Sequence, residues 1–338
     1  MSHQDFPEHG SFQDKLTFLL QFAVLAPSAH NNQPWQVRWN ASLTEASVSV
    51  DPEFNVMGGT PRLTIITLGV FIENLLEAAA HFNVALHISP VPMSAQVLSL
   101  NLTITEGSEV PPAQPVAFSG LERRHTNRGL YHTEPLSQEA MDALTAVEPE
   151  PGAQVTFVTD QADRELGGKL AAAGMRIALS LPPLRSELAH FVHFAQENSP
   201  TGMLAEAMVA GAAPTEDCSS GEQWALHKLP LTEEVALCRE KFATAPLQVI
   251  ISTTKDSFRD QFAAGRTMER ILNVAGSLGL THCIAAAATE VPILGPHIRT
   301  MSKSSAKPQL FFRLGIPQKP EFTIASPRRS VEQITKQQ

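Results

Sequence analysis

The spacing of apolar residues predicts alternating strands and helices in the first third of the chain. Apolar and polar side chains alternate over residues 35–39, 46–50 and 97–105, which is the period-two pattern of a strand with one buried face. Residues 69–82 repeat their apolar positions every three or four residues instead. That period predicts a helix whose one side is buried in the protein.

The same pattern continues through the rest of the chain. We expect strands at residues 154–158, 246–254 and 309–314, the last of these being the final strand, and helices at residues 163–181 and 256–280. Between them, the stretch 184–230 is less regular, with helical fragments separated by Pro, Gly and Ser. This alternation predicts an α+β or α/β fold in two halves of similar size.

A proline-rich passage, EVPPAQPVAF at residues 109–118, lies between the two halves. Its composition favours an extended linker over a helix or a strand. We therefore expect a first lobe at residues 1–110, a linker at 111–120 and a second lobe at 121–338.

Composition narrows the class of protein. The chain has 338 residues, 43% of them hydrophobic and 17% charged, which is enough for a large buried core. Its formal charge of −9 and the lack of a basic stripe argue against nucleic acid as a partner. The three cysteines lack CxxC spacing, which is typical of a reducing compartment. Without a signal-peptide pattern or ~20 consecutive apolar residues, we expect a cytoplasmic protein with no membrane partner.

Most familiar site signatures are missing from the sequence. There is no GxGxxG motif, complete phosphate-binding loop, GxSxG motif or HExxH motif. His190 and His193 are three residues apart in a segment that reads as helical, but no third ligand accompanies them. We expect no metal site.

Three polar features remain as candidates for chemistry. The first is the polar loop, APSAHNNQPW at residues 26–35, which can present Ser28, Asn31 and Gln33 to a polar ring edge between two rigid prolines. The second is the arginine segment, RRHTNR at residues 123–128, whose forked guanidinium groups suit a phosphate. Composition alone favours a capped turn that starts a strand for the polar loop and a solvated charged turn for the arginine segment.

The third feature is the pair Arg328 and Arg329, after Ser326 and Pro327 near the end of the chain. An exposed tail is the default interpretation of such a pair. The two arginine clusters could meet at one anion, and the sequence leaves that open.

Together these features resemble the FMN-dependent nitroreductase family. The APSxxNxQPW string is similar to the family's N-terminal signature, and RRHTNR is similar to its arginine-rich flavin segment. The closing QLFFRLGIP and SPRRS resemble its last strand and its basic phosphate-binding residues. The resemblance covers nearly the whole chain and implies an α+β nitroreductase-like fold with one FMN between two lobes.

The order of the motifs differs from the common pattern, in which the arginine segment comes first within a shorter subunit. Here residues 69–82 resemble the family's central dimer helix, and residues 266–280 resemble a second copy. The resemblance therefore implies a fused pseudo-dimer, similar to the mycobacterial Acg-type branch, in which an insertion at about 184–230 forms a lid over the flavin. Such a chain could be a monomer or form a further homodimer.

Residue by residue, the resemblance implies cofactor contacts and no dedicated catalytic residue. Arg124, Thr126 and Arg128 would contact the FMN phosphate and ribityl chain, and Arg328 and Arg329 the phosphate. From the opposite lobe, the resemblance brings to the flavin Ser28, Asn31 and Gln33. Position 29 is alanine where many relatives carry a second serine.

Two functions remain open at this stage. As an oxidoreductase, the protein would take hydride from NAD(P)H through FMN and reduce a nitroaromatic or quinone-type acceptor. As a binding protein, it would hold or store FMN under a closed lid, without turnover. A scaffold without flavin, with both arginine clusters facing solvent, is the third and weakest interpretation.

Overall fold

The computed structural model describes residues 5–51, 61–90, 99–105, 110, 115–319 and 325–337. The first lobe is built on a five-stranded sheet in the order β11-β1-β2-β4-β3, antiparallel except for the β11–β1 pair. Its elements are α1 (Phe12–Ala23), η2 (Ala29–Asn31), β1 (Trp35–Trp39), β2 (Ala46–Val50), α2 (Pro61–His81), β3 (Leu86–Pro90) and β4 (Ser99–Ile104).

The second lobe is built on a four-stranded antiparallel sheet in the order β5-β8-β10-β9. Its strands are β5 (Ala153–Val158), β8 (Leu247–Thr253), β9 (Thr281–Ile284) and β10 (Lys307–Gly315). The helices are α3 (Pro115–Leu121), α4 (Gln138–Thr145), α5 (Gln161–Ser180), α9 (Leu231–Ala243), α10 (Phe258–Ser277), α11 (Ala286–Glu290), η5 (Pro292–Leu294) and α12 (Gly295–Ser302).

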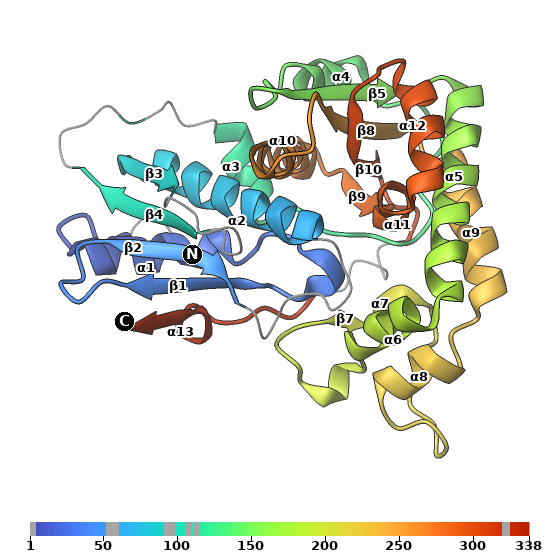
Figure 1. Cartoon of the computed structure of the whole chain (residues 1–338), viewed down its shortest axis with the longest axis horizontal. Coiled ribbons are helices and arrows are strands. Elements are labelled where there is room, and N and C mark those ends of the chain that lie inside the picture. Colours follow the sequence, from blue (N-terminus) through green and yellow to red (C-terminus); the bar gives the residue numbers. More distant parts are fainter. Residues whose placement is uncertain are drawn as a thin grey trace.

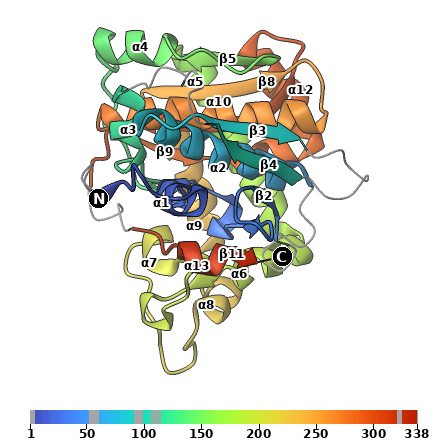
Figure 2. The ribbon, with the colours of Figure 1, turned by 90° about the vertical axis from the view of Figure 1, so that its left-hand side faces the viewer.

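A helical insertion, residues 182–229, lies between α5 and α9 (Figures 1 and 2). It has a small hydrophobic core of its own, which includes Phe194 and Trp224. Its elements are α6 (Pro182–His190), β6 (Val192–His193), η4 (Ala195–Glu197), β7 (Met203–Leu204), α7 (Ala205–Met208) and α8 (Gly221–His227). The structure thus confirms an α+β fold with two lobes and a helical insertion.

Helices α2 and α10 lie side by side between the two sheets (Figure 1). Their backbones approach closely because glycines face the partner helix. A Cβ atom on Gly69 would lie 2.3 Å from the carbonyl oxygen of Phe262, and one on Gly265 would lie 2.1 Å from that of Ile66. Any side chain at either position would push the helices apart. We call this contact the central interface.

Charged side chains flank this contact. The Glu73 carboxylate of α2 accepts hydrogen bonds from the Nε atoms of Arg266 and Arg270 of α10, each at 2.6 Å. Deeper in the same contact, the Asn273 amide donates to Asn74 Oδ1 at 3.0 Å. Because these groups bind one another across the contact, they also fix how the two helices align.

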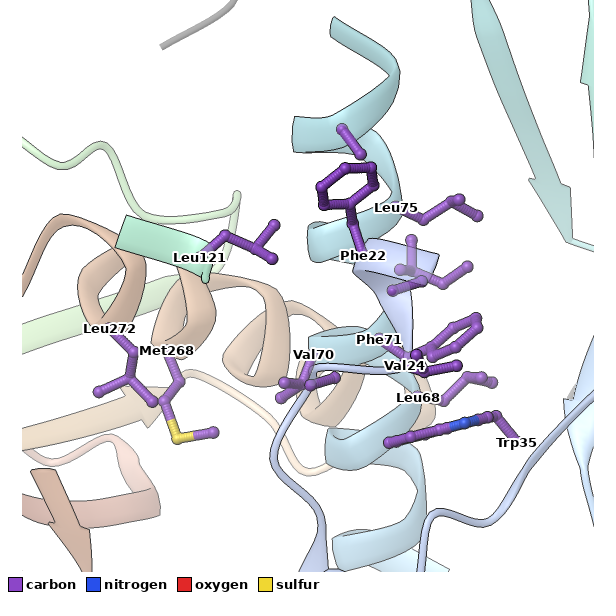
Figure 3. Close-up of a cluster of buried hydrophobic side chains, with 14 of the residues drawn as sticks. Phe22, Val24, Trp35, Leu68, Val70, Phe71, Leu75, Leu121, Met268 and Leu272 are labelled. Carbon is purple, nitrogen blue, oxygen red and sulfur yellow. The ribbon is translucent and has the colours of Figure 1, made fainter. Parts of the chain in front are cut away.

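The largest hydrophobic core extends through both lobes. Figure 3 shows Leu68, Phe71 and Leu75 on one side of α2 and Val70 on the side toward α10. The Trp35 ring stacks on Phe71, with ring centroids 4.8 Å apart. A single core shared in this way makes each lobe depend on the other for burial of its central helix.

Helix α2 accounts for the one membrane-span candidate among the described residues. The stretch Arg62–His81 is long and apolar enough to cross a membrane, yet 83% of its most apolar window is buried inside the protein. Surrounded in this way, it has the position of a core helix.

The structure corrects three of the sequence expectations. Residues 115–120 of the expected extended linker belong to helix α3, which packs against α10, while residues 111–114 lie outside the described residues. The central helix begins at residue 61, well before the expected start at 69, because burial on several sides outweighs the weak helix preference of its β-branched start.

The third correction concerns the end of the chain. The tail, residues 325–337, does not run out from the protein. It forms α13 (Val331–Ile334) and β11 (Thr335–Gln337), and β11 pairs in parallel with β1 of the first lobe. Strand β4 begins at Ser99, and the first two residues of that expected strand, 97 and 98, lie outside the described residues.

Candidate functional site

A cavity of about 510 Å³ lies between the two lobes and the insertion. Helix α2 and the polar loop contribute one wall, the arginine segment and β9 another, and the insertion a third. Residues of α5, α9 and β10 line the remaining part of the cavity, which we call the arm. Most of the lining side chains are apolar, and the polar or ionisable ones are Ser28, His30, Thr67, Thr126, Arg128, Glu187, Glu234, Cys238, Lys241, Cys283, Glu290 and Arg313.

The polar loop has an unusual backbone. His30, Asn31 and Gln33 have φ angles of 50°, 55° and 51°, in the left-handed region that asparagine tolerates better than the other two. The Ser28 hydroxyl accepts a hydrogen bond from the backbone N–H of Gln33 at 2.9 Å and helps to close the turn. Such strain persists only where surrounding contacts enforce it, and here they come from the insertion and the tail.

Asn31 and Gln33 supply those contacts. The Asn31 amide donates to the carbonyl oxygens of Gly202, at 2.8 Å, and Pro327, at 3.0 Å. The Gln33 amide donates to the carbonyl oxygen of Pro200 at 2.8 Å. Both side chains are therefore engaged in joining the loop to the insertion and the tail, and neither lines the cavity.

The three predicted residues of the arginine segment have different surroundings. Arg124 is buried, donates to the carbonyl oxygen of Leu25 at 2.6 Å and lies 3.5 Å from the Glu269 carboxylate. The Thr126 hydroxyl is 3.1 Å from His282 Nε2, and Arg128 contacts the sulfur of Met203 at 3.2 Å. Thr126 and Arg128 line the cavity and Arg124 does not.

The two arginines of the tail also have different partners. Arg328 donates to Asn31 Oδ1 at 2.8 Å and to the carbonyl oxygen of Leu25 at 3.3 Å. Arg329 turns into the first lobe instead, where it donates to the carbonyl oxygen of Gln33 at 3.0 Å and pairs with Asp51 at 3.4 Å. This partner carboxylate gives Arg329 the surroundings of a structural ion pair.

The two arginine clusters therefore meet at one point. Arg124 and Arg328 both donate to the Leu25 carbonyl oxygen, although one lies near the start of the second lobe and the other near the end of the chain. Burial and their mutual repulsion lower the pKa of Arg328, and burial lowers that of Arg124 despite Glu269. Neither Nε atom has a hydrogen-bond partner. The structure thus places two cations next to each other with donors to spare.

Positive charge also surrounds His282. Its pKa lies well below the usual value, first because the ring is buried and then because Arg124, Arg128 and other cations surround it. At neutral pH His282 is therefore uncharged and can share a hydrogen bond with the Thr126 hydroxyl.

Of the eight predicted site residues, the structure brings Ser28, Thr126 and Arg128 to the cavity wall. The other five join the polar loop, the arginine segment and the tail behind it. Sequence reasoning missed Arg313, Lys241, Cys238 and Cys283, which line the arm beneath α9. Arg313 carried a signal, because it is the one charged residue in the apolar run LFFRLG. Among the described residues, no group of three or more His, Cys, Asp or Glu is placed to hold a metal ion.

Comparison with known proteins gives one sequence match. No family model matches the chain. The chain is 27% identical over 151 residues to the "Probable NAD(P)H nitroreductase PigM" of Serratia sp. (strain ATCC 39006), and the match covers 40% of each chain. This match supports the nitroreductase superfamily. The aligned part spans well under half of the relative, so activity and partners are matters for proposal.

Several solved structures are also similar. An FMN- and NADPH-dependent nitroreductase, NfnB, from Sphigopyxis sp. strain HMH matches with a TM-score of 0.44 and 15% identity, covering 66% of this chain and 98% of that one. The FMN-dependent nitroreductase NfnB of Mycobacterium smegmatis, in complex with NADPH, matches with a TM-score of 0.43 and 14% identity, covering 65% and 97%. Scores below 0.5 do not establish a function for this chain.

Proposed function

We propose that the protein is an FMN-binding oxidoreductase of the nitroreductase type, which uses NAD(P)H to reduce nitroaromatic or quinone-type acceptors. One observation carries the proposal. Ser28 of the polar loop and Thr126 and Arg128 of the arginine segment, about a hundred residues apart in sequence, line one cavity between the lobes. These are the motifs on which the resemblance to nitroreductases rests, and the sequence match to a nitroreductase supports it independently.

The described residues fit FMN. A phosphate group needs several donors and positive charge. Arg124 and Arg328 offer both, because they meet at the Leu25 carbonyl oxygen and the Nε atom of Arg328 has no hydrogen-bond partner. Arg124 and Arg328 both interact with the Glu269 carboxylate, so two guanidinium groups face one carboxylate and an anionic ligand would balance the remaining charge.

The remaining roles in this proposal are binding and orientation. Ser28 and Thr126 can hydrogen-bond the polar parts of the cofactor, and the positive charge of Arg128 favours an anionic ring edge. The insertion supplies one wall of the cavity and would limit the access of water to a bound cofactor. Bound FMN would supply the hydride-transfer chemistry itself, so no side chain need act as nucleophile or general base.

A second function has support from the insertion. The backbone N–H of Gly202 donates to the Asn31 carbonyl oxygen, and the Gly202 carbonyl oxygen accepts from the Asn31 side-chain amide. Pro200 is held by Gln33 as well. An insertion tied to the polar loop by these hydrogen bonds would, if it stays closed, suit a protein that holds FMN and admits no second substrate.

The cofactor site is tested by FMN affinity. We expect Arg328→Ala to weaken FMN binding by roughly 10- to 100-fold, the equivalent of a lost charge-assisted contact. Arg123→Ala is the matched control, because Arg123 is the exposed neighbour of Arg124, and it should change the affinity less than twofold. Equal affinity of the Arg328→Ala variant and the wild type would refute the phosphate site.

The two functions are separated by the visible spectrum of the FMN-loaded protein, followed without oxygen while NADPH and then NADH are added. Rapid loss of the yellow colour, followed by recovery on addition of a nitroaromatic or quinone, supports the oxidoreductase. If the colour persists, the protein holds FMN without turning it over. Failure to bind FMN at all would contradict both.

A further inference from the structure

The arm of the cavity beneath α9 contains a buried arginine with unused donors. Arg313 on β10 is only 1% exposed. Its Nη2 atom donates to the carbonyl oxygens of Gly129, at 2.7 Å, and Asn127, at 3.4 Å. Its Nε and Nη1 atoms have no hydrogen-bond partner. Two buried donors of a charged group are thus left without an acceptor.

The charge of Arg313 is also unbalanced. Within the described part of the chain, no carboxylate forms an ion pair with Arg313 or with Arg128. The Tyr131 ring lies 3.9 Å from the Arg313 guanidinium carbon, and that of Phe242 lies 5.5 Å away. Aromatic faces offset part of the desolvation cost of a cation, but a buried guanidinium is usually matched by an anion.

The charged neighbours of Arg313 do not balance its charge, because Lys241 and the Glu234 carboxylate, which both line the cavity, pair with each other. Lys241 lines the same arm, and its one described ion pair, with Glu234, is long at 3.7 Å. The thiol of Cys238 lies close enough to Arg313 and Lys241 for both to act on its pKa, which burial raises to about 12. Cys238 is therefore protonated at neutral pH and supplies no negative charge.

Apolar side chains line the arm next to these groups. Ala171 and Met175 of α5 and Phe242 of α9 line it beside Arg313. Because Lys241 is paired with Glu234, the guanidinium of Arg313 is the charge in this arm that a ligand can match, and a second negative charge on the ligand would find no free partner there. A single carboxylate on an apolar body matches this guanidinium and the apolar side chains beside it.

We infer that Arg313 is the anchor of a subsite for a monocarboxylic acid with an apolar body. This inference deepens the proposed function, and the role of the ligand as electron acceptor rests on that function. A carboxylate bound in the same cavity would make an acidic molecule, such as an aromatic acid, the preferred acceptor. The subsite itself needs no cofactor in order to bind the acid.

The test compares two probes of similar shape, 4-nitrobenzoate and uncharged 4-nitrobenzyl alcohol, by isothermal titration calorimetry on the full chain. We expect the wild type to bind the acid at least about tenfold more tightly, the effect of one charge-assisted contact. In Arg313→Met, the two dissociation constants should come within twofold of each other. Arg239→Met, an exposed arginine on the same helix as Lys241, is the matched control and should keep the preference.

A second variant covers the case in which Arg313→Met fails to fold. Cys283 stands opposite Arg313 in the β9–β10 register, and both line the cavity, so Cys283→Asp supplies a resident carboxylate while Arg313 stays in place. This variant should also lose the acid preference. Equal binding of both probes by the wild type, or an acid preference that survives Cys283→Asp, would overturn the inference.

The titrations are made on protein with and without added FMN. If the wild type never takes up FMN but still prefers the acid, the proposed function fails and the subsite stands. If FMN binds and the acid preference is absent, the subsite fails alone.

Discussion

Two contacts hold the parts of this protein together, and they are built differently. In the central interface, α2 and α10 pack backbone to backbone through glycines within one shared hydrophobic core. In the insertion contact, residues 182–229 have their own core and meet the polar loop mainly through hydrogen bonds and one ring stack. Burial of apolar surface makes the central interface costly to open. The insertion contact costs less free energy to open, because water can replace its hydrogen bonds.

The difference assigns roles to the two contacts. We expect the walls of the cavity that come from the central interface to keep their shape, and the wall supplied by the insertion to open first. Substitutions in the central interface should therefore have larger effects than substitutions in the insertion contact.

We expect the largest effect from Gly265→Leu. Its Cβ atom would lie 2.1 Å from the Ile66 carbonyl oxygen, and a backbone clash cannot be relieved by a rotamer change. The free energy of unfolding, measured by urea denaturation, should fall by about 3 kcal/mol or more. Gly295→Ala is the control, because the nearest atom is 3.9 Å away, and it should change stability by less than about 0.5 kcal/mol. Near-wild-type stability of Gly265→Leu would show that the helices are not packed this closely.

Glu73→Gln should have the next largest effect. It removes the charge that Arg266 and Arg270 share while leaving the shape of the side chain. The two arginines are about one-fifth exposed, which screens part of the loss, so we expect destabilisation of about 2 kcal/mol at pH 7. Urea denaturation at low and high salt measures it. A neutral result would mean that the ion pairs only align the helices.

Glu77→Gln, one turn further along α2, should do the opposite. Burial and then the repulsion of Glu73 raise the pKa of Glu77 from 4.5 to about 7, although Arg266 and Arg270 oppose the shift. The folded state therefore holds this proton more tightly than the unfolded state, and the stability lost by ionising Glu77 is lost as pH rises from about 4.5 to about 7.

The variant should thus be more stable than the wild type by on the order of 1 kcal/mol at pH 8, with no difference at pH 4. Urea denaturation at the two pH values measures the gain, and Glu139→Gln on the surface of α4 is the control. A gain of equal size at both pH values would argue against the raised pKa.

The smallest effect is expected at the insertion contact. The His30 ring stacks on Phe191 with centroids 5.8 Å apart and lies 3.6 Å from the Glu187 carboxylate. His30→Ala should make local opening easier by about 1 kcal/mol, which speeds amide hydrogen exchange in residues 191–204 roughly fivefold and leaves global stability almost unchanged. Exposed His297→Ala is the control. If exchange were to speed up equally in α2, the insertion would not be opening independently.

Local pattern predicted many of the elements because their signals are short-range. The strands at residues 35–39 and 46–50 have the bounds that their alternation predicts. Helix α10 begins at Phe258, two residues after its expected start, because Ser257 and Asp260 form a capping box there. Where partners are distant, the same reasoning failed. Nothing local indicates that Thr335–Gln337 would pair with β1, since the pairing joins opposite ends of the chain.

The candidate site divides in the same way. By itself, the sequence pointed to the polar loop and the two arginine clusters as candidates for the polar chemistry, because short, specific motifs can be recognised without knowledge of the fold. Only the tertiary structure decided that Arg329 pairs with Asp51, that Arg124 meets Arg328, and that Arg313 is buried beneath α9 with donors unused. The physical reason is that a charged side chain takes its role from which groups surround it after burial, and those groups come from segments far apart in the chain.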